Sequence, residues 1–215
     1  MRAMLSRRLV LTAPLGLAAA PAAAQPHQAF QPTPRDSTDI ARIEAYLNTL
    51  RTMRARFIQV AADGGITRGA AWLWRPGRLR FEYDPPSPFL LVAGDHGLVF
   101  RDKELRQTSR IPLSRTPLGI LLAEHAKLSG DVAVTGVERL PGQIHLDLVR
   151  SASPGDGTLT LVFADNPLAL RQWTVVDAQG RATRISLFEM SLGGTLDPKL
   201  FEFHEDAAVP GSSGG

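Results

Sequence analysis

The chain has 215 residues, with 24 Lys and Arg, 21 Asp and Glu, and no Cys. Without cysteine it has no disulfide, no thiolate metal site and no cysteine that could itself be acylated. The three excess positive charges lie in Arg2, Arg7 and Arg8, so the remainder is formally neutral and lacks the basic surface expected of a protein that binds nucleic acid or an anionic membrane.

The N-terminal segment has the pattern of an export signal. The three arginines precede an apolar run over residues 9–20, and three alanines at 22–24 form a small-residue cleavage site. We therefore expect residues 1–24 to be a signal peptide that is cleaved after Ala24. Residues 6–11 approach the twin-arginine pattern, so general secretory and twin-arginine export both remain open. No later apolar run reaches the length of about 18 residues that spans a bilayer, which predicts a soluble mature chain.

The remainder predicts a single domain between two unstructured ends. Residues 25–37 are rich in Pro, Gln and Ala and predict a flexible arm, and residues 207–215 predict a disordered tail. The domain, residues 38–206, is expected to begin with an amphipathic helix that Ser37 or Thr38 can cap. Four apolar residues follow helical spacing in that helix: Ile40, Ile43, Leu47 and Leu50.

From Arg54 onward the apolar residues alternate with a period of two, which predicts strands. Leu79, Phe81 and Tyr83 give the clearest case, because charged residues separate them. We expect nine to eleven strands, two main helices and a short turn at 197–199, so the fold class is α+β and mainly β. Such an antiparallel sheet could close into a barrel, stack as a sandwich or curl around its helices, and periodicity does not choose among the three.

One apolar segment interrupts the strands in mid-chain. Thr116 can cap a helix with Pro117 at its first position, and the helix is expected to end before Gly130. Leu118 and Leu121 belong to an apolar surface that covers most sides of this helix. A helix of this kind is buried or covers something apolar, so the segment predicts a lid.

Five short motifs stand in a specific order along the chain. They are F-I-Q at 57–59, the stretch R-P-G-R-L-R-F-E-Y-D-P-P at 75–86, L-V-A-G-D-H-G-L at 91–98, T-P-L at 116–118, and L-D-P-K-L-F-E-F at 196–203. Together they resemble the periplasmic outer-membrane lipoprotein carrier family, LolA. The resemblance implies a curved antiparallel sheet that forms an incomplete barrel capped by helices around an apolar cavity.

The resemblance also implies a function, a location and partners. It implies a periplasmic carrier that shields the acyl chains of lipoproteins and moves them from an inner-membrane ABC-type release complex to the outer membrane or an acceptor there. We accordingly expect a monomer that is not an enzyme, needs no cofactor and binds no nucleic acid. A periplasmic lipid-binding sensor, or a carrier of another lipid on the same fold, is the alternative.

Arg75 is the residue to which the resemblance assigns the most specific role. It matches the family arginine that reaches from the sheet to backbone carbonyls of the lid and holds the empty cavity closed. Its five donors in a rigid fork suit that task better than lysine would. From sequence alone, a solvated arginine that ends a strand before Pro76 explains the same residue.

The residues that we expect to line the lipid cavity are apolar and fall on one face of their strands or helices. Strand alternation places Leu73 on the face of Arg75, with Trp72 and Trp74 on the other unless a bulge reverses them. Each of these residues could equally be ordinary core, because packing and cavity lining both require apolar side chains. The full set is Ile43, Leu47, Leu73, Leu79, Phe81, Tyr83, Leu91, Phe100, Leu118, Leu121, Leu161 and Phe163.

A secreted hydrolase is the hypothesis from a different class. The five histidines are scattered and show no metal-ligand spacing, and the chain has no G-x-S-x-G or H-E-x-x-H motif. His145 with Asp147, and His204 with Glu205 and Asp206, come nearest to a cluster. Solvated polar positions explain both groups, so catalytic and metal sites are expected to be absent.

Overall fold

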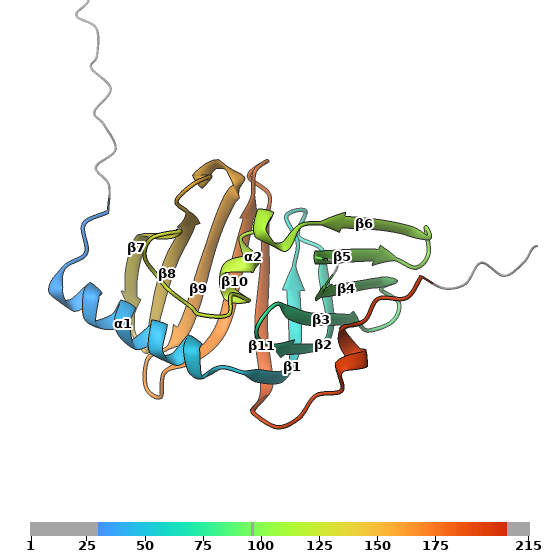
Figure 1. Ribbon diagram of the computed structural model, residues 1–215, viewed down its shortest axis with the longest axis horizontal. Helices are drawn as coiled ribbons and strands as arrows, with labels where there is room; N and C mark the ends of the chain where they lie inside the picture. The colour runs from blue at the N-terminus through green and yellow to red at the C-terminus, as the bar shows by residue number, and fades with distance from the viewer. Residues whose placement is uncertain (1–29, 96, 206–215) are drawn as a thin grey trace, which may run out of the picture.

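The computed structural model describes residues 30–95 and 97–205 and contains a single antiparallel sheet of eleven strands (Figure 1). The strand order is β6-β5-β4-β3-β2-β1-β11-β10-β9-β8-β7, so β6 and β7 form the two edges and the sheet does not close. This confirms the expected fold class of an incomplete barrel. The expected signal peptide, residues 25–29 of the expected arm, and the expected tail lie outside the described residues.

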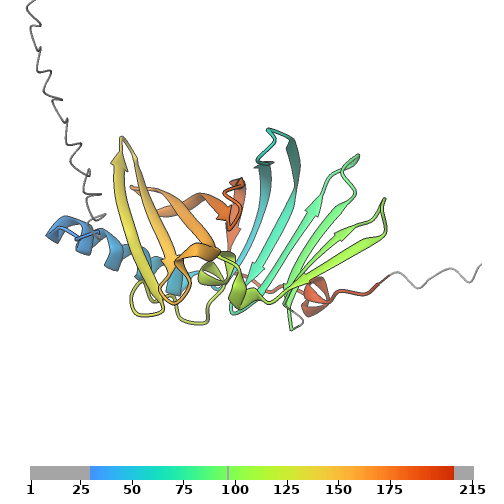
Figure 2. The same cartoon turned by 90° about the horizontal axis from the view of Figure 1, so that it is seen from above.

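The sheet consists of two meanders that meet at β1 and β11. Figure 2 shows them as two wings of one curved sheet. The first wing contains β1 (Thr52–Val60), β2 (Ile66–Trp74), β3 (Arg78–Tyr83), β4 (Phe89–Gly94), β5 (Gly97–Asp102) and β6 (Gln107–Ile111). The second wing contains β7 (Val132–Leu140), β8 (Gln143–Arg150), β9 (Gly157–Ala164), β10 (Ala169–Asp177) and β11 (Ala182–Leu192).

The helices are one long α-helix and several short turns. They are α1 (Pro34–Thr49), α2 (Leu118–Leu121) and the 3-10 helices η1 (Leu113–Arg115), η2 (Pro154–Asp156) and η3 (Pro198–Phe201). The connection between the wings carries η1 and α2, and η3 confirms the short turn expected at 197–199. Among the described residues, no helix is long and apolar enough to cross a membrane.

The helix α1 begins earlier than the sequence predicts. Thr33 is its N-cap: the Thr33 hydroxyl accepts from the backbone N–H of Asp36 at 3.2 Å, and the Asp36 carboxylate accepts from the N–H of Thr33 at 2.8 Å. This reciprocal capping box, with Pro34 at the first position, outcompetes the expected cap at Ser37 or Thr38. Residues 34–37, expected in the arm, are therefore helical.

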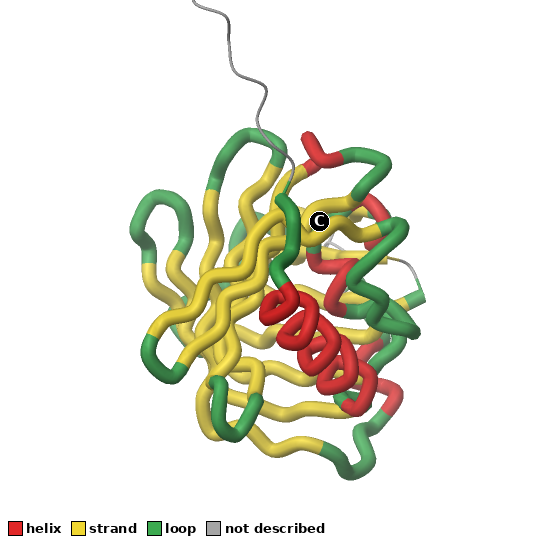
Figure 3. Tube along the Cα trace, turned by 90° about the vertical axis from the view of Figure 1, so that its left-hand side faces the viewer, coloured by secondary structure: helices red, strands yellow, loops and turns green. Residues whose placement is uncertain are grey.

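The helix α1 crosses in front of the second wing (Figure 1) and lies against the sheet (Figure 3). At its N-terminal end, Asp36 and Asp39 both accept from the guanidinium of Arg139 on β7 at 2.7 Å. Further along, the ring of Tyr46 packs edge-on against Phe163 of β9 with ring centroids 5.8 Å apart. Ion pairs at one end and apolar packing in the middle therefore fix α1 over the inner face of this wing.

The mid-chain helix is much shorter than expected. The sequence predicts a helix that runs from Pro117 to just before Gly130, but α2 ends at Leu121 and an ordered loop follows. Two backbone groups of this loop bond to distant parts of the chain: Leu122 O accepts from Gly77 N–H, and Ala126 N–H donates to Asn48. These non-local partners replace the hydrogen bonds that a longer helix would have formed.

Candidate functional site

Strand alternation sorts the residues of the first wing onto two faces. Leu73, Leu79 and Phe81 lie on the inner face and are at most 2% exposed. Trp74 lies on the outer face, where its ring meets Phe201 of η3 edge-on at 5.9 Å between centroids. The predicted orientation of Leu73 and the neighbouring tryptophans is therefore confirmed, without the bulge that would have reversed it.

A small apolar cavity of about 100 Å³ lies on the inner face where the two wings meet. Its lining comes from β1, β3, β4, α2, β10 and β11, and consists of Gln59, Phe81, Tyr83, Leu91, Leu118, Trp173, Val175, Thr183 and Ile185. The Tyr83 hydroxyl donates to Gln59 Oε1 at 2.7 Å. Burial raises the pKa of the Tyr83 phenol to about 12, so this group remains neutral and the cavity carries no charge at neutral pH.

The expected lining residues divide into three groups. Phe81, Tyr83, Leu91 and Leu118 line the cavity. Phe100 is 37% exposed on β5, where its ring stacks at a tilt against Phe89. The remaining seven, each at most 2% exposed, are packed in the core: Ile43, Leu47, Leu73, Leu79, Leu121, Leu161 and Phe163.

Five lining residues were missing from the sequence prediction. Trp173, Val175 and Ile185 lie on the apolar faces of strands that the sequence does identify, so alternation was a usable signal for them. Alternation places Thr183 on the same face as Ile185, but Thr183 and Gln59 are polar and so were not candidates for an apolar lining. Their place in the lining depends on the register of β1, β10 and β11, where Gln59 faces Ile185 and Thr183 faces Val175.

The lid, which we define as residues 116–128, closes one side of this space. Leu118, Leu121 and Leu122 are buried against the core, and Leu118 also lines the cavity. The lid therefore supplies part of the cavity wall. Its displacement would expose apolar surface of the lid itself and of the core beneath it.

Arg75 fastens the lid from the end of β2. It is 3% exposed, and its Nε and Nη2 donate to Ala123 O of the lid at 3.0 and 2.6 Å, while Nη1 donates to Leu47 O of α1. Burial lowers the pKa of Arg75, and the charge of Arg51 lowers it further. Because these three hydrogen bonds end on carbonyl oxygens of two separate elements, the guanidinium joins the sheet, α1 and the lid at one point.

Three further contacts hold the lid from α1 and from the second wing. Asn48 of α1 bonds both backbone groups of Ala126 at 2.9 Å, and Glu44 accepts from Leu128 N–H at 2.8 Å. From the second wing, Arg150 Nη2 donates to Thr116 O at 3.3 Å. The lid is thus held along its whole length in the closed arrangement.

The closed arrangement is too small for an acyl chain. Pockets that hold small ligands enclose about 300–1,000 Å³, several times the volume of this cavity. A chain could enter only if the lid moved or if the packed core residues beneath it rearranged. The geometry is that of a small apolar cavity covered by a segment that Arg75 joins to the sheet and to α1.

The polar residues that the sequence singled out as the nearest approaches to a cluster have separate partners. The described residues contain no group of three His, Cys, Asp or Glu side chains placed to hold a metal ion. Asp147, expected beside His145, instead accepts from the hydroxyl of Thr160 at 2.6 Å. His204 lies 3.1 Å from Glu202 and is exposed.

The chain is similar to proteins of one known family. Residues 48–204 match the family model described as outer membrane lipoprotein carrier protein LolA. An outer-membrane lipoprotein carrier protein of Pseudomonas paraeruginosa is 31% identical over 180 residues, covering 78% of this chain and 84% of the relative. The protein of the same name from Methylococcus capsulatus is 29% identical over 183 residues, covering 81% and 87%.

Among solved structures, a LolA superfamily protein from Nitrosomonas europaea has a TM-score of 0.42 and 12% identity, covering 76% of this chain and 97% of that one. The family match extends over most of the chain, and the relatives are matched over most of their length. The chain therefore belongs to the LolA family of outer-membrane lipoprotein carrier proteins.

Proposed function

We propose that this protein is a periplasmic carrier that takes up the acyl chains of lipoproteins beneath its lid and moves them from an inner-membrane ABC-type release complex to the outer membrane. The observation that supports the proposal is the set of three hydrogen bonds from buried Arg75 to carbonyl oxygens of α1 and of the lid, whose Leu118 lines the apolar cavity. Family membership supports the cargo class, because the relatives are named lipoprotein carriers.

The energetics explain why a carrier needs a lid that holds itself closed. Burying an acyl chain is favourable by about 0.8 kcal/mol per methylene, so three chains of about 15 methylenes amount to roughly 36 kcal/mol as an upper estimate. A carrier that bound cargo with that free energy would not release it. Hydrogen bonds to a charged group contribute about 1.5–3 kcal/mol each, so breaking those of Arg75 on opening offsets part of the binding free energy.

The remaining features of the proposal concern partners and chemistry. The cargo is an acylated lipoprotein, the donor is the release complex, and the recipient is the outer membrane or an acceptor protein there. The carrier acts as a monomer, without catalysis and without a cofactor. Its neutral charge after removal of the first 24 residues fits a protein that exchanges cargo with membranes without adhering to anionic lipid.

Native mass spectrometry of the mature protein tests the proposal directly. We expect a one-to-one complex after incubation with a triacylated lipoprotein in detergent-free buffer, and no complex with the same lipoprotein lacking its acyl chains. A free lipid that co-purifies, with no lipoprotein bound, would instead support a sensor or a carrier of another lipid. No bound species of either kind would contradict the carrier role.

A further inference from the structure

An apolar surface flanked by arginines lies on the outer face of the sheet, where the two wings meet. The registers of β1 with β2 and β11 place five residues there, which we call the junction surface: Ile58, Val60, Ile66, Arg68 and Arg184. Val60 is paired with Ile66 on β2 and with Arg184 on β11, and Ile58 is paired with Arg68 on β2. The apolar side chains therefore form the centre of the surface, and the two arginines form its flanks.

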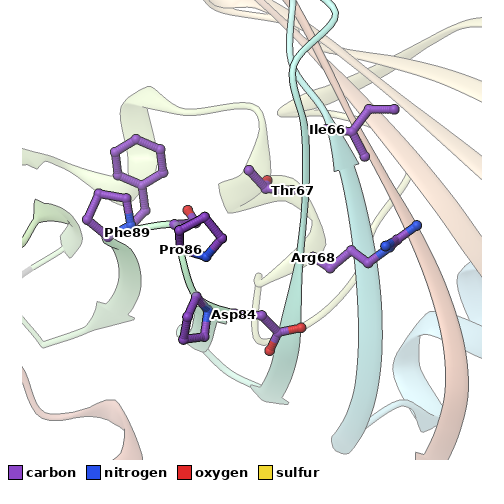
Figure 4. A pocket seen from close by; sticks show the side chains of 9 residues that line it. Ile66, Thr67, Arg68, Asp84, Pro86 and Phe89 are labelled. Atoms are coloured by element: carbon purple, nitrogen blue, oxygen red, sulfur yellow. The ribbon is translucent and has the colours of Figure 1, made fainter.

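The junction surface is open to solvent. Ile66 is 65% exposed, and both arginines are exposed as well. In Figure 4, Ile66 and Arg68 extend to one side of β2. Thr67 extends to the other side, into a hollow of about 480 Å³ between β2 and residues 84–89 that Ile66 and Arg68 also border. A bound segment would thus have access to the apolar centre and to the guanidinium groups.

The two arginines of the junction surface have no carboxylate partner among the described residues. Neither the Arg68 nor the Arg184 side chain forms an ion pair or a hydrogen bond there. By contrast, Arg56 on the same face is paired, because its guanidinium donates to both carboxylate oxygens of Asp84. Hydrogen bonding to Asp84, and then the charge of Glu189, raise the pKa of Arg56. The neutral total charge of the mature chain therefore conceals a local excess of positive charge, which favours an acidic partner.

The spacing of the two arginines indicates the form of that partner. They stand two strands apart and two residues out of register, so their Cα atoms are about 12 Å apart, given about 4.8 Å between strands and about 3.3 Å per residue. An extended segment spans that distance in about four residues, and its residues i, i+2 and i+4 point to the same side. Carboxylates at i and i+4 can therefore each meet one arginine, while an apolar residue at i+2 meets the centre.

We propose that the junction surface docks an extended acidic segment of a partner protein. Two Asp or Glu residues four positions apart bind Arg68 and Arg184, and the apolar residue midway between them packs on the centre of the surface. Arginine suits this task because its planar fork binds a carboxylate with two parallel hydrogen bonds. A bilayer fits less well, since recognition of anionic lipid uses clusters of about four to eight Lys and Arg.

The junction surface lies back to back with the wall of the apolar cavity. Gln59 of β1 and Ile185 of β11 line the cavity, and each is the direct sequence neighbour of a junction residue. A partner bound outside therefore contacts the same two strands whose inner faces enclose the cavity. The surface is present whether or not the cavity takes up acyl chains, so the docking of a partner is independent of the proposed carrier role.

The test titrates the isotope-labelled mature protein with short synthetic peptides and follows the backbone amides by NMR. The probe contains the sequence E-T-L-T-E, and a charge-reversed peptide contains K-T-L-T-K. We expect the acidic peptide to shift the amides of β1, β2 and β11 around the junction surface, and the basic peptide to leave them unchanged. In the double variant R68Q/R184Q the dissociation constant of the acidic peptide should rise by about 2- to 30-fold, since two surface ion pairs are lost.

A matched control removes two exposed arginines outside the junction surface. R35Q/R171Q has the same net charge as R68Q/R184Q and is expected to bind the acidic peptide like the wild type. Equal binding by R68Q/R184Q and the wild type would overturn the proposal, and so would an absence of these shifts in the wild type alone. Binding of phosphatidylglycerol vesicles through Arg68 and Arg184, with no shift caused by the acidic peptide, would overturn it in favour of a membrane contact.

Discussion

Arg75 is a buried cation whose three hydrogen bonds end on the carbonyl oxygens of Ala123 and Leu47. Its energetic role differs from that of an ion pair, because the partners are backbone groups that can find water once the lid moves away. Removal of the side chain should therefore weaken closure of the lid more than it weakens the whole fold.

We predict that Arg75→Leu remains folded but opens its lid more easily. Loss of these bonds should lower the free energy of local opening by about 1–3 kcal/mol, which raises hydrogen exchange at the amides of Ala126 and Leu128 by roughly 5- to 150-fold. The same variant should fail to sustain lipoprotein delivery in a strain depleted of the wild type. The exposed Arg171→Leu serves as control. Unchanged exchange together with normal delivery would refute the role of Arg75.

Trp173 should report cavity occupancy. It lines the cavity and is 2% exposed, whereas Trp72 and Trp74 lie on the other face of the sheet. A brominated fatty acid should therefore quench part of the tryptophan emission of the wild type, and that part should be missing in Trp173→Phe. Equal quenching in both proteins would place the chain outside the cavity.

At the scale of elements, the sequence predicts some features of the fold well and others poorly. The strand faces follow from local alternation, which is why Leu79, Phe81 and Tyr83 could be placed in advance. The start of α1 was misplaced because its capping residues Thr33 and Asp36 lie in a Pro-rich stretch that indicates an arm.

The lid and the cavity could be predicted only in part. The short length of α2 follows from partners far away in sequence, such as Asn48 and Gly77, which no local pattern contains. The cavity volume depends on how completely the core side chains fill the space between the wings. The role of Arg75 could not be predicted from local sequence either, because its sequence neighbours fit a solvated side chain as well as a buried one. Only the family resemblance indicated that Arg75 contacts the lid.

The N-terminal end of α1 should lose stability in acid. The hydrogen bonds from Thr33 and then Arg139 lower the pKa of Asp36 from 3.8 to about 2. A carboxyl with a depressed pKa stabilises the folded state above its unfolded value, and that contribution is lost as the pH falls from 3.8 toward 2.

We therefore predict that Asp36→Asn is less stable than the wild type at neutral pH, and that the difference shrinks over this acidic range. Urea unfolding of both proteins at several pH values measures it, with the exposed Asp131→Asn as control. A difference in free energy of unfolding that stays constant down to pH about 2 would contradict the assignment of Asp36 as the titrating group.

At the scale of the whole molecule, the two wings meet at β1 and β11, and the lid ties them together. Arg75 and Gly77 hold it from the first wing, Arg150 holds it from the second, and α1 holds it through Glu44 and Asn48. A sheet with free edges at β6 and β7 can change its curvature more easily than a closed barrel can. Release of the lid would therefore let the cavity widen between the wings.

The most direct test of this account fixes the lid to α1 and asks whether acyl chains can still enter. The chain has no native cysteine, so Asn48→Cys with Ala126→Cys can be joined by a short, cleavable thiol-reactive linker. Binding of the triacylated lipoprotein is then measured before cross-linking, after it, and again after cleavage. We predict that binding is lost in the cross-linked protein and returns on cleavage, whereas equal binding in all three states would contradict entry beneath the lid.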